Sequence, residues 1–282
     1  MISEKVIKQA SNILKNHNIR THELDAQLIL SDILKVKKEY LIINNKSIVS
    51  KKNIKKYNIA IRRRAKNEPV AYILGKKEFW SKDFIVNSST LVPRPETELL
   101  IYKIISCFKN RKIRVLDIGT GSGCIILSIL KELNQATGVG IDISSKAIKI
   151  AKKNSLNLNL SNRVKFKTFD LCKYNLGKYD LIVSNPPYIS SKDIKSLSKD
   201  ITNYEPLKAL DGGTDGLDLI KKVIYKSKYL LKTNGILAIE IGFNQYHKVS
   251  KLLKYFGFRE LSKEYDFNRN IRCIISTKVN FF

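Results

Sequence analysis

Cysteine, histidine and proline are scarce in this sequence of 282 residues. It has four cysteines, three histidines and six prolines, and no two cysteines form a CxxC pair. These counts exclude a disulfide-stabilised mini-protein and a collagen-like fibre, and they argue against a zinc site. We therefore predict no metal centre and expect buried free thiols in a reducing compartment. The four thiols are Cys107, Cys124, Cys172 and Cys273.

Long hydrophobic runs are also lacking. No run approaches the roughly 20 apolar residues that span a bilayer, and the first 20 residues lack the apolar core of a signal peptide. Hydrophobic residues at 43% and charged residues at 27% fit a soluble globular protein with a sizeable core. We expect a cytoplasmic protein of one large domain or two ordinary ones, with no membrane partner.

Acidic residues are too few to balance the basic ones, so the net charge is +27. This surplus favours a polyanionic partner such as DNA or RNA. However, 41 of the 52 basic residues are lysine, whereas nucleic-acid readers favour arginine for bidentate contacts. An AT-rich genome also accumulates Lys, Asn and Ile codons wherever substitution is tolerated. Functional charge and compositional drift both remain open.

The residue pattern divides the chain into three parts. Residues 1–75 show apolar positions at helical spacing and predict a small helical bundle, with a third helix over about 51–66. Residues 76–95 alternate aromatic and polar side chains and predict a β-hairpin linker. From residue 96 to 282, short β-branched strands alternate with helices.

This alternation predicts the α/β class, with a parallel sheet covered on both faces. The last two strand-like runs are joined by a short polar turn over 267–270, which predicts an antiparallel hairpin at the end of the sheet. Strands are expected over 114–118, 138–143, 164–169, 180–184, 236–241, 258–266 and 271–278, with helices over 123–133 and 145–157.

A glycine loop, DIGTGSG at 117–123, follows the first predicted strand and leads into a helix. Glycine there permits positive φ and lets a ligand approach the backbone. The second strand ends at Asp142, where a carboxylate can bind ribose hydroxyls. The G-x-G-x-G spacing is typical of S-adenosylmethionine sites, whereas the dinucleotide fingerprint is G-x-G-x-x-G. An NAD enzyme remains the rival interpretation of this loop alone.

A tetrapeptide, Asn185-Pro186-Pro187-Tyr188, follows the fourth predicted strand at the edge where α/β sheets bind ligands. Prolines lack an N–H and fix an extended backbone, so their carbonyls and the Asn185 oxygen are available as acceptors. Two adjacent acceptors match one planar –NH₂ group, and Tyr188 can cover a planar substrate. Holding the nitrogen in this way aims its lone pair at an incoming methyl carbon. The motif therefore predicts amino- or amide-methylation, of adenine, guanine or glutamine.

Five segments resemble the HemK/PrmC family of peptide chain release factor N(5)-glutamine methyltransferases, and the resemblance runs from about residue 20 to the end. The combination of LVPRPETE and NPPYI is specific, while the glycine loop is shared by many methyltransferases. The segments are PVAYILGKKEFW (69–80), LVPRPETELL (91–100), VLDIGTGSGCI (115–125), IVSNPPYI (182–189) and EPLKALDGGTDGL (205–217).

The resemblance implies a helical N-terminal domain that recognises the substrate, joined to a seven-stranded Rossmann-like methyltransferase with S-adenosylmethionine as cofactor. It implies that the glutamine of the GGQ tripeptide in bacterial class 1 release factors is the substrate. Asn185 to Tyr188 form the catalytic clamp, and Pro93, Arg94 and Glu96 lie against the cofactor side. The implied cofactor-binding residues are Gly119, Thr120, Gly121, Ser122, Gly123, Asp142, Asp170, Leu171 and Asn185.

One position departs from the family pattern. Leu171 follows Asp170 where the family often has an aromatic residue against adenine, so apolar contact replaces stacking. A nucleic-acid amino-methyltransferase acting on adenine N6 or guanine N2 is the alternative, although the chain lacks the large target-recognition domain that base flipping requires. A non-catalytic cofactor-binding scaffold has no need for the tetrapeptide. We expect no stable nucleic-acid complex.

Overall fold

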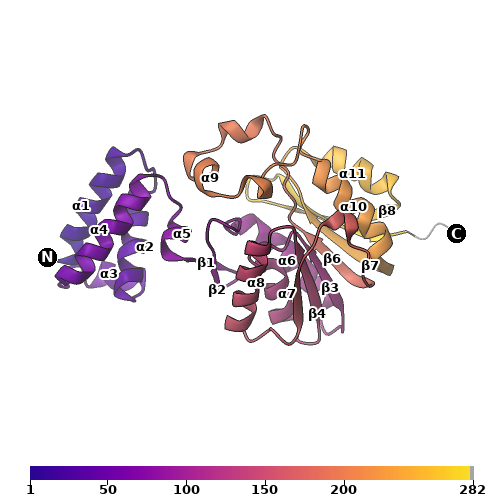
Figure 1. Ribbon diagram of the computed structural model, residues 1–282, viewed down its shortest axis with the longest axis horizontal. Coiled ribbons are helices and arrows are strands. Elements are labelled where there is room, and N and C mark those ends of the chain that lie inside the picture. The colour runs from indigo at the N-terminus through magenta and orange to yellow at the C-terminus, as the bar shows by residue number, and fades with distance from the viewer. Residues whose placement is uncertain (280–282) are drawn as a thin grey trace. The chain divides into compact units, whose positions relative to one another are not determined.

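The computed structural model describes residues 1–279 and divides them into two compact units (Figure 1). The helical unit comprises residues 1–76 and 198–204, and the sheet unit comprises 77–197 together with 205 onward. None of the helices in the described part of the chain is both long and apolar enough to cross a bilayer. The predicted domain boundaries at 75 and 95 remain predictions.

The helical unit has its own apolar core. Leu14, Ile29, Leu30 and Ile61 are fully or almost fully buried in it, and the Tyr57 hydroxyl donates to the Ala26 carbonyl at 2.9 Å. The helix predicted over about 51–66 lies at 51–65, whereas three helices of five or six residues are too short to show a periodicity. The helices are α1 (Ser3–Asn16), α2 (His22–Leu34), α3 (Lys38–Ile43), α4 (Lys51–Ala65), α5 (Val70–Leu74) and, from later in the chain, α9 (Lys199–Tyr204).

The sheet unit contains a seven-stranded sheet in the order β5-β4-β3-β6-β7-β9-β8. The first five strands in this order pair in parallel, and β9 pairs antiparallel with both β7 and β8. This confirms the predicted parallel sheet with a terminal antiparallel hairpin. The strands are β3 (Arg114–Ile118), β4 (Thr137–Asp142), β5 (Val164–Thr168), β6 (Tyr179–Ser184), β7 (Leu231–Glu240), β8 (Phe258–Tyr265) and β9 (Ile271–Lys278).

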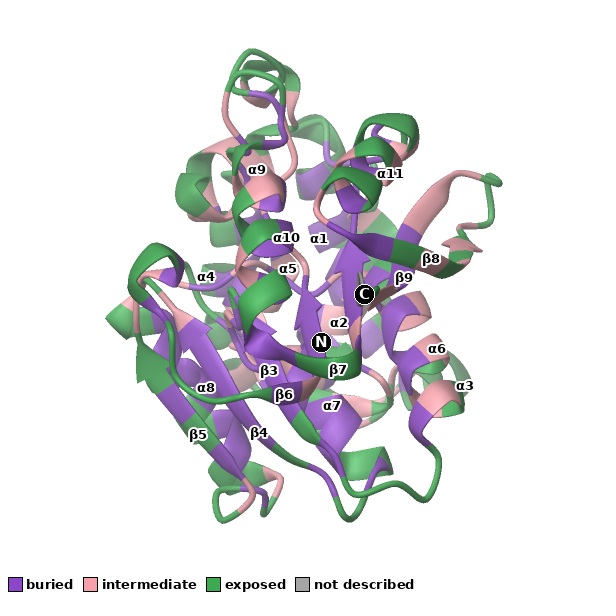
Figure 2. Ribbon diagram, turned by 90° about the vertical axis from the view of Figure 1, so that its right-hand side faces the viewer, coloured by how far each residue is buried: buried purple, intermediate pink, exposed green. Residues whose placement is uncertain are grey.

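Two apolar cores lie on opposite faces of the sheet, because alternate strand residues point to opposite sides. Val115 and Leu181 pack with α6, α7 and α8, whereas Leu116 and Ile182 pack with α10 and α11. Figure 2 shows the central strands as buried. The covering helices are α6 (Glu98–Phe108), α7 (Cys124–Glu132), α8 (Ser145–Asn157), α10 (Asp218–Leu230) and α11 (Tyr246–Tyr255).

One predicted strand is wrong at its start. β7 begins at Leu231 and not at 236, because Leu231 already pairs with Tyr179 while Ile236 pairs with Leu181. The intervening polar residues resemble a turn in sequence, yet the structure accommodates them as a bulge, with Asn234 at φ 58°.

The strand order places a topological switch point beside β3. The chain passes from β3 to β4 and β5 on one side, and then to β6 and β7 on the other. Open α/β sheets bind ligands at the carboxyl ends of the strands that flank such a switch. The glycine loop after β3 and the tetrapeptide after β6 therefore lie next to each other.

A short hairpin precedes the sheet and braces the glycine loop. β1 (Lys76–Phe79) and β2 (Lys82–Ile85) confirm the predicted hairpin. Asn154 is fully buried beneath it: its Oδ1 accepts from Ile85 N at 2.7 Å, and its Nδ2 donates to Ile85 O at 3.0 Å and to Ser122 O at 2.9 Å. One side chain thus ties α8, the hairpin and the loop together.

We predict that Asn154→Ala lowers the free energy of unfolding by about 2–4 kcal/mol, because three hydrogen bonds are lost and the buried groups of Ile85 and Ser122 lose a partner. Urea denaturation measures the change. Asn157→Ala, at an exposed position on the same helix, is the matched control and should change stability by less than about 0.5 kcal/mol. Equal effects of the two substitutions would contradict the bracing role.

Candidate active site

A cavity of about 750 Å³ opens at the carboxyl edge of the sheet, where the strand order predicts a ligand site. Seven of the residues that the sequence assigns to the site form part of its wall: Gly119, Gly121, Asp142, Asp170, Leu171, Asn185 and Pro187. The wall also includes apolar side chains that the sequence did not single out, among them Ile118, Ile141, Ile143, Phe169 and Leu207. The cavity wall therefore combines polar groups with apolar side chains.

The three glycines of the loop have different roles. All have positive φ, at 73°, 54° and 81° for Gly119, Gly121 and Gly123. A Cβ on Gly119 or Gly121 would meet no side chain within 4 Å, so these two leave open space at the cavity. A Cβ on Gly123 would lie 3.1 Å from Leu127 and 3.2 Å from Phe166. Gly123 is thus required by packing.

Two other loop residues that the sequence assigns to the cofactor lie behind the cavity wall. Thr120 and Ser122 are 4% and 2% exposed. The Thr120 hydroxyl donates to Asp117 Oδ2 at 2.7 Å, and Ser122 O accepts from Asn154. Their polar groups therefore hold the loop in shape.

Asp142 supports the loop as well as facing the cavity. Its Oδ2 accepts from Gly121 N at 2.9 Å and its Oδ1 accepts from Ser144 N at 2.8 Å. Burial raises the pKa of this carboxyl, and the backbone hydrogen bonds oppose the rise. The sequence predicted only a ribose-binding role, whereas the geometry adds a structural link between β4, the loop and α8.

Asp117 is a fully buried acid beneath the loop. Its Oδ2 accepts from Thr120, while its Oδ1 has no hydrogen-bond partner among the described residues. Burial raises the pKa of Asp117 to about 7, against the lowering effect of the Thr120 hydrogen bond. A carboxyl of this kind is costly to ionise in the native state.

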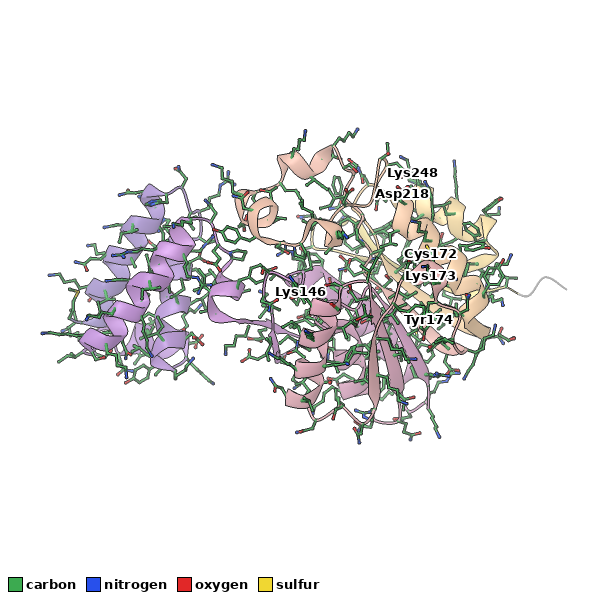
Figure 3. The ribbon with its side chains drawn as sticks, in the orientation of Figure 1. Lys146, Cys172, Lys173, Tyr174, Asp218 and Lys248 are labelled. Atoms are coloured by element: carbon green, nitrogen blue, oxygen red, sulfur yellow. The ribbon has the colours of Figure 1, made fainter. Side chains whose placement is uncertain are left out.

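An aromatic ring does lie on the cavity wall, two positions before the one where the family pattern places it. Phe169 precedes Asp170 and packs edge-on against Tyr174 at 5.3 Å between ring centroids. Asp170 Oδ1 accepts from Cys172 N at 2.8 Å and caps η2 (Leu171–Lys173), a segment marked in Figure 3. Leu171 also lines the cavity, and its apolar contact with adenine stays a prediction.

The cysteines differ in burial. All four are free, as predicted, but only Cys273 is buried, while Cys107 and Cys124 are half-buried and Cys172 is exposed. The expectation of a buried Cys172 is wrong because this residue lies in the η2 turn and not on a helix or strand that faces a core.

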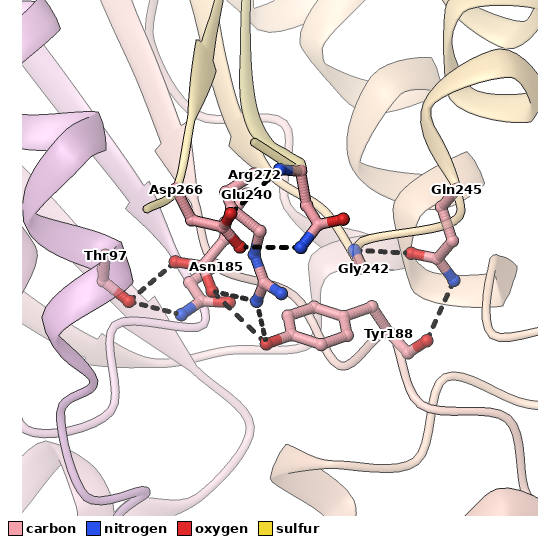
Figure 4. Close-up of polar contacts among 9 residues, drawn as sticks. Thr97, Asn185, Tyr188, Glu240, Gly242, Gln245, Asp266 and Arg272 are labelled. Atoms are coloured by element: carbon pink, nitrogen blue, oxygen red, sulfur yellow. Dashed lines mark hydrogen bonds and ion pairs between the residues drawn. The ribbon is translucent and has the colours of Figure 1, made fainter. Parts of the chain in front are cut away.

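The tetrapeptide contributes two of its four residues to the wall. Asn185 and Pro187 line the cavity, whereas Pro186 is buried and Tyr188 packs against the core on the α10 side. The Tyr188 hydroxyl accepts from Arg272 Nη2 at 3.0 Å and donates to Glu240 Oε1 at 3.4 Å (Figure 4). Tyr188 is therefore engaged by its hydroxyl, a contact that the sequence did not predict.

A chain of hydrogen bonds continues from Glu240 to Asn185. Thr97 Oγ1 donates to Glu240 Oε2 at 2.6 Å and accepts from Asn185 Nδ2 at 3.1 Å (Figure 4). Glu240 is fully buried, and burial raises its pKa to about 7 while Thr97 and Arg272 oppose the rise. Sequence reasoning missed Thr97, Glu240 and Arg272, although Thr97 lies in LVPRPETE and Glu240 ends a strand at the edge of the sheet where ligands bind.

Two further segments support the backbone of the tetrapeptide. Gln245 Nε2 donates to Tyr188 O at 2.9 Å and to Gly216 O at 3.1 Å. A Cβ on Gly212 would lie 2.8 Å from Pro187 O, so the DGGTDG turn packs directly against the tetrapeptide backbone. Rigid support of this kind fixes where the backbone carbonyls point.

The LVPRPETE segment is fixed by a buried acid. Glu205 accepts from Val92 N at 3.1 Å and pairs with the Arg94 guanidinium. Pro93, Arg94 and Glu96 do not form part of the cavity wall, whereas Leu91 does. The segment thus lines the cavity through Leu91 and contacts Asn185 through Thr97.

Comparison with known proteins identifies the family. A model of the PrmC N-terminal domain matches residues 5–75, and a model of the methyltransferase small domain matches residues 96–204. The release factor glutamine methyltransferase of Clostridium acetobutylicum is 37% identical over 281 residues, 98% of each chain. That of Buchnera aphidicola subsp. Schizaphis graminum is 42% identical over 90% of this chain and 92% of its own. The chain belongs to the release factor glutamine methyltransferase family.

A solved structure shows the same fold in a more distant protein. The methyltransferase from Pyrococcus furiosus has a TM-score of 0.54 at 17% identity, over 77% of this chain and 98% of its own. The motif residues of this member of the release factor glutamine methyltransferase family fall into two groups. Some line the cavity, and the others form the hydrogen-bonded support behind its wall.

Asp117 should make the cofactor-free protein less stable as the pH rises. Its native pKa of about 7 lies above the unfolded value, so between about pH 4 and 7 the native state binds more protons than the unfolded chain, and stability falls across that range. Asp117→Asn removes the ionisation. Urea denaturation should show the variant gaining about 1–3 kcal/mol relative to wild type between pH 5 and pH 8. The same difference at both pH values would contradict a raised pKa.

Proposed function

We propose that this chain transfers a methyl group from S-adenosylmethionine to the side-chain amide nitrogen of the glutamine in the GGQ motif of bacterial class 1 peptide chain release factors. The observation that carries this proposal is Asn185 on the cavity wall, held by its amide nitrogen so that its oxygen is left for the cavity. Relatives of nearly full length are named release factor glutamine methyltransferases, and their names favour glutamine over a nucleic-acid base.

The cavity suits the cofactor. Gly119 and Gly121 leave open space, and the Asp142 carboxylate stands at the end of β4 where it would hold ribose hydroxyls. Phe169, Leu171 and Ile143 provide the apolar surface that would cover an adenine. When bound, S-adenosylmethionine supplies an electrophilic methyl group.

The clamp would act by position and by electrostatics. An amide nitrogen is a weak nucleophile because its lone pair is delocalised. Asn185 Oδ1 and the Pro186 carbonyl would accept its two N–H bonds, orient the lone pair and stabilise the positive charge that develops on nitrogen. Tyr188 is not a base in this scheme, because burial raises the pKa of its hydroxyl. The methylated amide would lose its extra proton to water, since a protonated amide is a strong acid.

We also propose that the reaction takes place in the cytoplasm, on the free release factor and without a stable nucleic-acid complex. Release factors are cytoplasmic proteins of translation, which supports the first point. Compositional drift of lysine over the surface would account for the net charge of +27 without a nucleic-acid partner, and a transfer rate that does not change between low and physiological salt would support it.

One labelling experiment tests the proposal. The protein is incubated with methyl-labelled S-adenosylmethionine and purified release factor, beside total tRNA, rRNA and DNA. Label should appear in the release factor alone. A release factor with glutamate in place of the GGQ glutamine should remain unlabelled, because a carboxylate offers no N–H to the clamp. Label in a nucleic acid, or in the glutamate variant, would overturn the proposal.

Asn185→Ala removes one acceptor and leaves the backbone largely unchanged, because Pro186 and Pro187 fix it. We expect a modest loss of cofactor affinity by calorimetry and at least a roughly 100-fold loss of methyl transfer, as when one preorganised transition-state contact is removed. Asn185→Asp restores an acceptor and should retain more activity than alanine. Near-normal turnover by Asn185→Ala would disprove the clamp.

Gly121→Val should abolish cofactor binding because its side chain would fill the open space at the cavity. Strain at positive φ is a separate effect, and Gly75→Val controls for it. Gly75 has φ 72°, its Cβ, like that of Gly121, would meet no side chain within 4 Å, and it lies outside the cavity. Calorimetry should show wild-type affinity for Gly75→Val and no binding for Gly121→Val; binding by both would contradict the assignment of the loop.

A further inference from the structure

The Thr97 hydroxyl lies between an amide and a carboxylate. It is 3.1 Å from Asn185 Nδ2 and 2.6 Å from Glu240 Oε2, and Thr97 itself is 2% exposed (Figure 4). A hydroxyl has a single hydrogen to donate. If that hydrogen goes to Glu240, then Thr97 can only accept from Asn185.

The ionisation of Glu240 therefore decides which way this chain of hydrogen bonds runs. An ionised carboxylate only accepts, so Thr97 donates to it, the Asn185 –NH₂ faces Thr97, and Oδ1 is left for the cavity. A protonated Glu240 can donate to Thr97. Thr97 then donates to Asn185, whose amide turns over and presents –NH₂ to the cavity. Two –NH₂ groups that face each other cannot form the clamp.

We propose that Thr97 and ionised Glu240 are positioning residues that select the amide orientation of Asn185 and so make the site an acceptor for a substrate –NH₂ group. The inference rests on the proposed function, because the orientation matters only for a substrate that donates two N–H bonds. Neither residue forms part of the cavity wall, so both act through Asn185.

The groups around Glu240 have opposing effects on its pKa. Arg272 Nη2 lies 3.9 Å from Oε1, and the Tyr188 hydroxyl donates to the same oxygen, so both favour the ionised form. Burial and the Glu96 carboxylate oppose it, and together they leave the pKa near 7.

The other groups that interact with Glu240 do not titrate in the same range. The thiols of Cys124 and Cys273 have pKa values raised by burial, so they stay neutral below pH 8. Asp266, whose pKa is lowered, acts on Arg272. Protonation of Glu240 below about pH 7 should therefore reverse the chain and reduce methyl transfer.

The kinetic test compares two substitutions of Thr97. Thr97→Val keeps the shape of the side chain and removes the hydroxyl, whereas Thr97→Ser keeps the hydroxyl. On the release factor, kcat of the valine variant should fall by about 10-fold or more, with unchanged calorimetric affinity for S-adenosylmethionine. The serine variant should stay within about 3-fold of wild type. Thr277→Val removes a hydroxyl at the far end of β9 and should match wild type. Equal activity of Thr97→Val and Thr97→Ser would overturn the proposal.

Glu240→Gln distinguishes orientation from simple charge loss. The contacts of Arg272 and Tyr188 with Oε1 place the glutamine oxygen there, so its –NH₂ faces Thr97 and imitates the protonated acid. The wild-type pH profile of kcat should fall on the acid side of about pH 7. The variant should be weakly active at every pH and should lack this limb. A wild-type profile that is flat from pH 6 to 8, or a variant that retains the limb, would count against Glu240.

A spectroscopic measurement is independent of turnover. The side-chain amide of Asn185 is followed by NMR in protein labelled with ¹⁵N-asparagine, and its signal is assigned by its loss in Asn185→Ala. The wild-type signal should move with a midpoint near pH 7, and in Glu240→Gln it should stay at the acid position. No movement in wild type would overturn the inference. If the Asn185 signal of the wild type moves with pH but the release factor stays unlabelled, the proposed function is refuted. The hydrogen-bonded link from Glu240 through Thr97 to Asn185 would still stand.

Discussion

The register of three parallel strands sets the geometry of this site. Ile118 of β3 pairs with Ser184 of β6, and Ser184 pairs with Ile239 of β7. Gly119 and Asn185 therefore follow their strands at the same edge of the sheet, where Glu240 is the last residue of β7. A one-residue slip in either pairing would turn every strand side chain to the opposite core. The two apolar cores thus fix the register, and the register brings together the glycine loop, the proposed substrate acceptor Asn185 and a buried acid.

Two acids beneath the site show the cost of this arrangement. Asp117 and Glu240 are both fully buried, and burial raises the pKa of each to about 7. Each has a threonine hydroxyl as its shortest hydrogen bond, from Thr120 and Thr97. Such acids destabilise the native state near neutral pH, because burial penalises their charged form. Their placement beneath the glycine loop and behind the clamp indicates that the stability lost here serves the organisation of the site.

The sequence predicted the parts of this protein that depend on local pattern. The limits of β3 and α8, the terminal hairpin, the glycine loop and the tetrapeptide follow from periodicity, glycine and proline. It did not predict contacts between distant residues: Thr97 and Asn185 are 88 positions apart, and no spacing rule connects them. The start of β7 was missed because a polar bulge resembles a turn. Phe169 was missed because the family pattern directed attention to position 171.

The support behind the tetrapeptide would explain how this site fits a planar amide, if Asn185 and the Pro186 carbonyl are the proposed acceptors. Glu205 fixes the LVPRPETE segment, Gln245 binds the Tyr188 carbonyl at the end of the tetrapeptide, and the DGGTDG turn packs against Pro187 O. A backbone carbonyl always accepts, but the side chain of Asn185 can either accept or donate. The carbonyl acceptor is therefore determined by folding alone, whereas the second acceptor depends on a group that controls the asparagine. Glu240 is such a group, since it reaches Asn185 through one hydroxyl and is shielded from solvent. A site built in this way needs no base on its wall, because its selectivity comes from the direction of two hydrogen bonds.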